Sequence, residues 1–150
     1  MFSRILLLLL VPLFVLGCSS SPSDTPGKPH EIPAPPDVEA PPADAQRSAS
    51  GLASKVLTAG TGTRHPRPNS RVRVHYTGWL KSGTMFETTT GSQPAEFALN
   101  EVVKGWTEGV QMMVEGEKRR FWIPAKLAYG DTGEVSGPLV FDIELVKILS

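Results

Sequence analysis

Residues 71–77 read Arg-Val-Arg-Val-His-Tyr-Thr, with polar and apolar side chains in alternation. In a strand, successive side chains point to opposite faces, so Val72, Val74 and Tyr76 would share one face. Such alternation is typical of a strand that covers a core on one side only. This stretch therefore predicts a β-sheet with one buried face.

Two later stretches show the same period. Residues 118–123, Lys-Arg-Arg-Phe-Trp-Ile, would place Phe121 and Ile123 on one face and Trp122 on the other. Residues 139–145, Leu-Val-Phe-Asp-Ile-Glu-Leu, would turn their odd-numbered apolar residues inward. Weaker strand candidates are residues 54–58, 84–88 and 96–99.

Only one segment has helical spacing. Trp106, Val110 and Met113 fall at i, i+4 and i+7, which places them on one face of a helix. Gly105 and Gly109 each weaken that helix by about 1 kcal/mol relative to alanine, so it would not form alone. The glycines would instead permit close approach to a sheet. The sequence therefore predicts an α+β fold, a twisted antiparallel β-sheet wrapped around one short α-helix.

The N-terminus has the features of an exported protein. Residues 5–16 are apolar but too few to span a membrane, which takes about 20 residues. Leu16-Gly17-Cys18-Ser19 follows and resembles a bacterial lipobox. This resemblance implies a lipoprotein signal peptide over residues 1–17, a lipid on Cys18 and a membrane anchor in the cell envelope, with Ser19 favouring the outer membrane. The alternative is an ordinary secretory signal that leaves a free thiol.

A segment without hydrophobic periodicity follows the lipobox. Eight of the fourteen prolines lie between residues 19 and 50, among Ala, Ser, Asp and Glu. Such a composition rarely buries enough apolar surface to order itself. We therefore expect residues 18–50 to be a disordered, Pro/Ala-rich tether reaching on the order of 100 Å, and residues 51–150 to form the globular domain.

Composition and motifs exclude several classes. Fifteen Lys and Arg balance fifteen Asp and Glu, which argues against a nucleic-acid partner. The single cysteine excludes a disulfide framework, and His30, His65 and His75 lack metal-ligand spacing. No nucleophile elbow or Walker motif is present, and His75 is better explained as a structural residue. We expect neither a metal nor a cofactor.

Aromatic residues are the remaining feature with chemical meaning. Tyr129 stands in a predicted loop, and Trp106 begins the predicted helix beside glycine. The indole could form the floor of a cavity. From the residues alone, a concave aromatic pocket and plain core packing explain these aromatics equally well.

Several blocks, in this order, resemble the FKBP family of peptidyl-prolyl cis-trans isomerases. They are Val-His-Tyr-Thr-Gly at 74–78, Gly-Thr-Met-Phe-Glu at 83–87, Val-Val-Lys-Gly-Trp-Thr-Glu-Gly at 102–109, Ala-Tyr-Gly at 128–130 and the stretch at 139–145. Residues 94–97 and 116–124 resemble the bacterial branch of the family. The match covers nearly all of residues 53–149.

The resemblance implies a site, position by position. Trp106 would be the floor beneath a substrate proline, with Tyr76, Phe86 and Phe141 as walls. The backbone of Val102 and Val103 would meet the ligand. Tyr129 would bond a substrate carbonyl. Glu87 stands where the family usually has aspartate, and its extra methylene would either let the carboxylate reach the Tyr76 hydroxyl or move it off line. The implied site residues are Tyr76, Phe86, Glu87, Val102, Val103, Trp106, Tyr129 and Phe141.

The implied activity is non-covalent rotation about X–Pro bonds of envelope proteins, favoured by desolvation in the pocket. The implied partners are proline-containing polypeptides and macrolides, with the chain acting as a monomer. Ala95 replaces a wall phenylalanine of some relatives, and the loop at 131–137 is shorter than in others, so we expect a shallower pocket. The alternatives are a membrane-tethered proline-peptide binding module with little turnover and a structural lipoprotein whose aromatics are only core.

Overall fold

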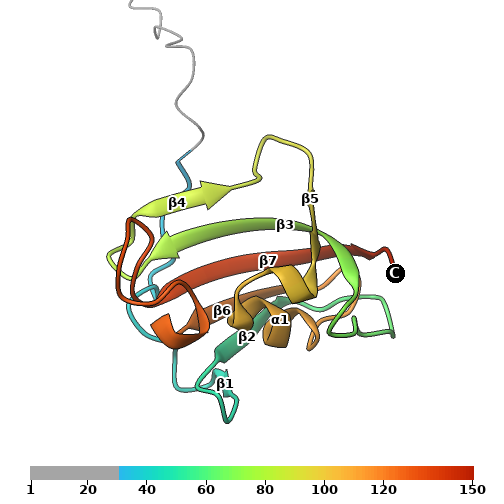
Figure 1. Ribbon diagram of the computed structural model, residues 1–150, viewed down its shortest axis with the longest axis horizontal. Helices are drawn as coiled ribbons and strands as arrows, with labels where there is room; N and C mark the ends of the chain where they lie inside the picture. The colour runs from blue at the N-terminus through green and yellow to red at the C-terminus, as the bar shows by residue number, and fades with distance from the viewer. Residues whose placement is uncertain (1–30) are drawn as a thin grey trace, which may run out of the picture.

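The computed structural model describes residues 31–150. Signal peptide and lipid attachment were predicted for residues 1–18, which lie outside this range. All strand pairs are antiparallel and join one sheet in the order β1–β2–β6–β7–β3–β4, with β5 also paired to β3 (Figure 1). The strands are β1 (Gln46–Arg47), β2 (Ala53–Thr58), β3 (Arg71–Leu80), β4 (Met85–Thr88), β5 (Ala95–Ala98), β6 (Lys118–Ile123) and β7 (Leu139–Ile148).

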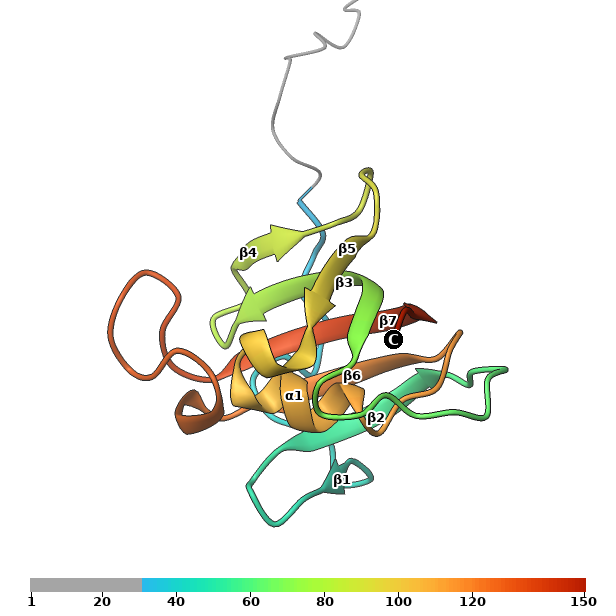
Figure 2. The same ribbon diagram turned by 45° about the vertical axis from the view of Figure 1, so that its right-hand side comes forward.

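The helices are short and lie on one face of this sheet. They are the 3₁₀ helices η1 (Leu99–Glu101) and η2 (Ala125–Leu127) and the α-helix α1 (Lys104–Val110). Figures 1 and 2 show α1 in front of the strands. None of the helices in residues 31–150 is long and apolar enough to cross a bilayer. The predicted α+β architecture is confirmed.

The two long strands β3 and β7 form the centre of the sheet. They pair from Val72↔Ile148 to Leu80↔Leu139, so each is longer than its alternating stretch predicted. Strand β6 has the predicted bounds, and its Phe121 and Ile123 are buried against α1. Strands β4 and β5 pair with opposite halves of β3, which leaves a break in the sheet edge between them.

The glycines of α1 let the helix approach the sheet. A Cβ at Gly105 would lie 2.5 Å from Ile123 Cγ2, and one at Gly109 would lie 2.6 Å from Phe121 Cε1. A larger residue at either position would require the buried Ile123 or Phe121 side chain to move. The helix ends at Val110, earlier than the spacing suggested, yet Met113 is fully buried in the turn beyond it.

The prediction of a disordered tether up to Ser50 is wrong for the part that the structure describes. Residues 31–45, here called the strap, run along the sheet face opposite α1 and lead into β1 (Figure 2). Trp79, Trp122 and Val140 form a second buried cluster on that face, and Val38 packs into it. The ordered unit therefore begins before residue 51. The composition concealed this, because the apolar partners of the strap lie on the sheet rather than within the strap.

Hydrogen bonds fix the strap in place. Trp79 Nε1 donates to the Ile32 carbonyl at 2.9 Å, and Trp122 Nε1 donates to the Asp37 carbonyl at 2.8 Å. Arg120 donates to Asp37 Oδ1 at 2.9 Å while it also forms a two-pronged pair with Asp142 of β7. Two buried indoles thus satisfy their donors on the strap backbone, as buried polar groups must.

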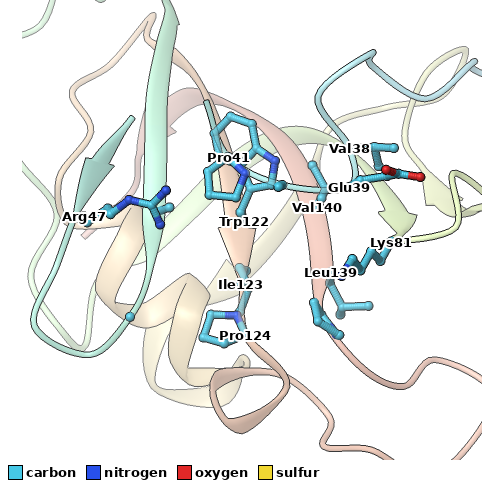
Figure 3. Close-up of a pocket in the computed structure, with 14 residues that line it drawn as sticks. Val38, Glu39, Pro41, Arg47, Lys81, Trp122, Ile123, Pro124, Leu139 and Val140 are labelled. Atoms are coloured by element: carbon cyan, nitrogen blue, oxygen red, sulfur yellow. The ribbon is translucent and has the colours of Figure 1, made fainter. Parts of the chain in front are cut away.

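A shallow hollow of about 230 Å³ remains where the strap meets the sheet. Figure 3 shows Val38 and Pro41 of the strap, with Trp122, Leu139 and Val140 of the sheet around it. Trp122 is its only aromatic residue, and the indole N–H is already engaged by the strap. The hollow is therefore a gap left where the strap packs on the sheet. A candidate functional site has to lie on the other face of the sheet.

Candidate active site

A larger cavity, of about 470 Å³, opens on the face that carries α1. Trp106, the third residue of α1, forms part of its lining although the side chain is only 5% exposed. The floor is thus an indole with most of its surface packed and the remainder facing the cavity. The nine lining residues are Tyr76, Glu87, Phe97, Glu101, Val102, Val103, Trp106, Tyr129 and Phe141.

Three aromatic rings stand nearly perpendicular to the indole. The ring centroids of Tyr76, Phe141 and Phe97 lie 5.0, 5.4 and 5.5 Å from that of Trp106, at interplanar angles of 86°, 89° and 83°. Edge-to-face pairs of this kind contribute about 0.5–1.5 kcal/mol each beyond the area that they bury. The rings therefore hold one another as a rigid apolar cup.

Strand geometry places two of these walls. Tyr76 and Phe141 project from the neighbouring strands β3 and β7 toward α1. Gly78 pairs with Phe141 across the strands, and a Cβ there would lie 2.7 Å from the Phe141 ring and 2.6 Å from Phe86. The missing side chain at Gly78 is what lets both phenylalanines fit.

Phe86 does not line the cavity as the sequence predicted. Its ring packs edge-to-face on Phe141, with centroids 5.5 Å apart. Phe86 thus packs against one of the cavity walls. The position of a wall is instead filled by Phe97 of β5, which pairs with Val72 and contacts Tyr76 at 5.9 Å between ring centroids.

Phe97 and Glu101 are the lining residues that the sequence analysis did not assign to the site. The alternation in residues 96–99 could have placed Phe97 on the same face as buried Leu99. Glu101 ends η1 and directly precedes Val102. That position next to the predicted ligand-binding backbone was the available signal.

Val102 and Val103 connect η1 to α1 at the rim of the cavity. The Thr107 hydroxyl donates to the Leu99 carbonyl, which ties the helix to η1 across this turn. The Val103 carbonyl caps α1 by accepting from the amides of Trp106 and Thr107. Within residues 31–150 the Val103 N–H itself has no hydrogen-bond partner, so it is available to a ligand.

Tyr129, unlike the buried Trp106, is largely exposed, with 59% of its surface accessible. It follows η2, and the chain then turns at Gly130, whose φ of +82° favours glycine. The Gly130 N–H donates to the Ala125 carbonyl, and the Gly137 N–H donates to the Gly130 carbonyl at 2.8 Å. These bonds hold the base of the 131–137 loop and present the Tyr129 hydroxyl to the cavity rim.

Electrostatics couple Tyr76 to Glu87. Burial raises the pKa of the Tyr76 hydroxyl far above its usual value, and the nearby negative charge of Glu87 raises it further. The Glu87 carboxylate thus acts electrostatically on this hydroxyl. Tyr76 remains a neutral hydrogen-bond donor throughout the physiological range.

Histidine and metal chemistry do not enter this cavity in the described part of the chain. His75 faces away from it, with Nδ1 2.9 Å from the Thr89 hydroxyl, which fits the structural role expected. Within residues 31–150, no three His, Cys, Asp or Glu side chains gather in a way that could hold a metal ion. What the arrangement offers is an apolar cup with a few hydrogen-bonding groups at its rim.

An antiparallel sheet over a short helix, with an aromatic cup at the helix start, defines a class of small ligand-binding domains. A family model described as FKBP-type peptidyl-prolyl cis-trans isomerase matches residues 62–146. The chain belongs to this family.

Comparison with individual relatives supports this family assignment. The FKBP-type peptidyl-prolyl cis-trans isomerase FkpA of Aeromonas hydrophila is 49% identical over 104 residues, which cover 66% of this chain and 38% of that protein. The outer membrane protein MIP of Legionella longbeachae is 41% identical over 105 residues, 66% of this chain and 45% of that protein. Peptidyl-prolyl cis-trans isomerase FPR2 of Saccharomyces cerevisiae is 47% identical over 92 residues, 55% of this chain and 68% of that protein.

Among solved structures, FkpA from Escherichia coli superimposes with a TM-score of 0.66 at 36% identity. The match covers 71% of this chain and 52% of that one. This chain therefore spans about half or less of the length of these three bacterial relatives.

Proposed function

We propose that this chain is a peptidyl-prolyl cis-trans isomerase whose cavity over Trp106 binds a proline and accelerates rotation about the preceding amide. The observation that carries the proposal is the aromatic cup of about 470 Å³, floored by an indole and open to solvent on one side. The apolar rings suit a pyrrolidine ring, and the rest of the cavity leaves room for the residues on either side of the proline.

The chemistry follows from the amide bond. Resonance gives the C–N bond double-bond character and a rotation barrier of about 18–20 kcal/mol, and it places negative charge on the oxygen. The twisted transition state has lost that resonance and is less polar than the planar ground state. A cup that excludes water from the oxygen therefore binds the twisted form better, and each 1.36 kcal/mol of that preference is a tenfold gain in rate.

Seven of the nine lining residues have a role in this scheme. Trp106 and the three perpendicular rings hold the proline. The free N–H of Val103 donates to a backbone carbonyl of the peptide, and the Tyr129 hydroxyl donates to a second one. Glu87 orients the Tyr76 hydroxyl. No bond to the protein is made or broken, so the step needs no nucleophile.

The test is a two-state exchange measurement on the purified full chain with a short peptide that contains Leu-Pro. Catalysed cis-trans exchange, saturable by the peptide, is the expected result. Binding of the peptide without faster exchange would instead identify a proline-peptide binding module. Neither binding nor exchange would reduce the aromatic cup to core packing.

We also propose that the chain is anchored in the cell envelope through a lipid on Cys18, with proline-containing envelope polypeptides as substrates. The apolar run at 5–16 and the lipobox-like residues 16–19 support this, as does the name of the Legionella relative as an outer membrane protein. The test is fractionation of cells that express the wild type or Cys18→Ser. The wild type should sediment with membranes, while an unchanged distribution of the variant would contradict lipid attachment.

Macrolides are a further proposed ligand class for the cavity. We also propose that the domain acts as a monomer. The large apolar side chains exposed within residues 31–150 are few and include Tyr129 at the cavity rim, with Val56, Leu57 and Val146 elsewhere. Such scattered residues are normal on a monomer. Competition between a macrolide and the peptide, together with the molar mass in solution, tests both statements.

A further inference from the structure

The charged side chains around the cavity are all of one sign. Glu87 and Glu101 line it, and within residues 31–150 no Lys, Arg or His does so. Glu87 comes from β4 and Glu101 from the end of η1, so the two carboxylates approach the cavity from different elements. An otherwise apolar cup is thus bordered by two negative charges.

These two carboxylates differ from their neighbour Glu96. Arg73 Nη2 lies 2.7 Å from Glu96 Oε1, and Arg71 lies within 3.7 Å of the same carboxylate. In the described part of the chain, neither Glu87 nor Glu101 forms an ion pair. Lys104 is three residues from Glu101 but is exposed and outside the lining. The field of the two carboxylates is therefore not cancelled at the cavity.

We propose that Glu87 and Glu101 make this domain selective for prolines flanked by lysine or arginine, and that acidic flanking residues are disfavoured. The inference rests on the proposed proline site. A proline seated over Trp106 places the residues on either side of it at the rim, where both carboxylates lie. The apolar rings recognise the proline, and the carboxylates discriminate between its neighbours.

The size of the effect follows from the exposure of both groups. Both Glu87 and Glu101 are exposed, and exposed ion pairs change an equilibrium by a few-fold each. Two such contacts should give about a three- to tenfold preference in kcat/KM for a basic peptide over a neutral one. Salt near 1 M, where the screening length is about 3 Å, should remove most of that preference.

The experiment compares three peptides that differ only at the two residues flanking proline, which are lysine, norleucine or glutamate. Norleucine retains the aliphatic length of lysine without its charge. Exchange is followed without a protease, because proteases have charge preferences of their own, and affinity is measured in parallel. We expect the order lysine, norleucine, glutamate in both kcat/KM and affinity for the full chain.

The variants Glu101→Gln and Glu87→Gln keep the side-chain size and remove one charge each. The measured quantity is the ratio of kcat/KM for the lysine peptide to kcat/KM for the norleucine peptide, taken within each variant. A general loss of activity lowers both values and leaves this ratio unchanged. Glu101→Gln should lower the ratio about two- to threefold, and the double variant should bring it near one. Glu144→Gln is the matched control, since Glu144 is exposed on β7 away from this cavity, and it should leave the ratio unchanged.

Equal affinities and equal rates for the lysine and norleucine peptides would overturn the inference while the proposed isomerase function stood. A charge preference in affinity without faster exchange of any peptide would support the selectivity and overturn the isomerase proposal. An equal drop in the ratio for Glu144→Gln would assign the effect to net charge rather than to the two rim residues, which also overturns the inference.

Discussion

Individual side chains of the cup serve both packing and chemistry, and they do so to different degrees. Phe141 contacts Trp106, Tyr76 and Phe86, so it belongs to the core as much as to the site. Tyr129 is mostly exposed. Its hydroxyl can therefore be removed with little effect on folding, which makes it the cleanest residue for separating function from stability.

Tyr129→Phe should lower kcat/KM for a Leu-Pro peptide about two- to tenfold, because one hydrogen bond to the substrate is lost and such bonds contribute about 0.5–1.5 kcal/mol. The melting temperature should stay within a degree or two of the wild type, as checked by thermal unfolding. Parent-like turnover and parent-like affinity together would show that this hydroxyl does not touch substrate.

The environment of Tyr76 predicts a loss of stability at alkaline pH. Burial and Glu87 raise its pKa in the folded state above the ordinary value of 10.0. The folded protein therefore keeps the proton that the unfolded chain releases, and stability from this group falls as the pH rises above 10, by about 1.4 kcal/mol per pH unit. Denaturant unfolding between pH 9 and 11 measures this slope. Tyr76→Phe should flatten it, and an unchanged slope in that variant would point to other groups.

Among the elements, the strap changes what counts as the domain. Trp79 and Trp122 donate their indole N–H groups to carbonyls of the strap, and Val38 of the strap is buried against the sheet. The strap lies across the sheet from α1 and the cup. It should therefore contribute to stability without taking part in turnover on small peptides.

A chain that begins at Ala49 should be less stable than one that begins at Glu31, by roughly 2–4 kcal/mol, because two tryptophans and Val140 lose their cover. Its turnover on a Leu-Pro peptide should be close to that of the longer chain at a temperature where both are folded. Chemical denaturation of the two chains measures the difference. Equal stability would show that the strap only rests on the sheet.

Sequence reasoning recovered the elements whose pattern is local. Strand β6 was predicted with its observed bounds. The close approach of Gly105 and Gly109 to the sheet was expected because a helix with two glycines would not be stable in isolation. The strap was missed because its stability is not local. A retrospective signal was the apolar Trp122, on the face of its strand that should have been solvated.

The spatial grouping of the candidate site residues could be predicted to a similar extent, and for related reasons. Seven of the eight predicted pocket residues line one cavity, while Phe86 packs on the wall residue Phe141. Whether Phe86 or Phe97 lines the cavity depends on how β4 and β5 pair along the edge of β3. Strand pairing at that distance cannot be read from periodicity, so only the assembled sheet decides which phenylalanine faces the cavity.

At the scale of the whole molecule, one sheet has a tryptophan with a distinct role on each face. Trp106 floors the open cup, whereas Trp122 is sealed beneath the strap. Both are buried large aromatics, so their replacement has comparable costs in packing. They form a matched pair for asking whether the cup, and not merely a well-packed domain, accelerates proline isomerisation.

The most direct measurement is therefore the catalysed cis-trans exchange rate of a Leu-Pro peptide for the wild type, Trp106→Leu and Trp122→Leu, at a temperature where all three are folded. The wild type and Trp122→Leu should catalyse exchange at similar rates, and Trp106→Leu should be slower by about tenfold or more, which corresponds to roughly 1.4 kcal/mol of lost transition-state binding. Equal rates for the two variants, or no catalysis by the wild type, would contradict the account.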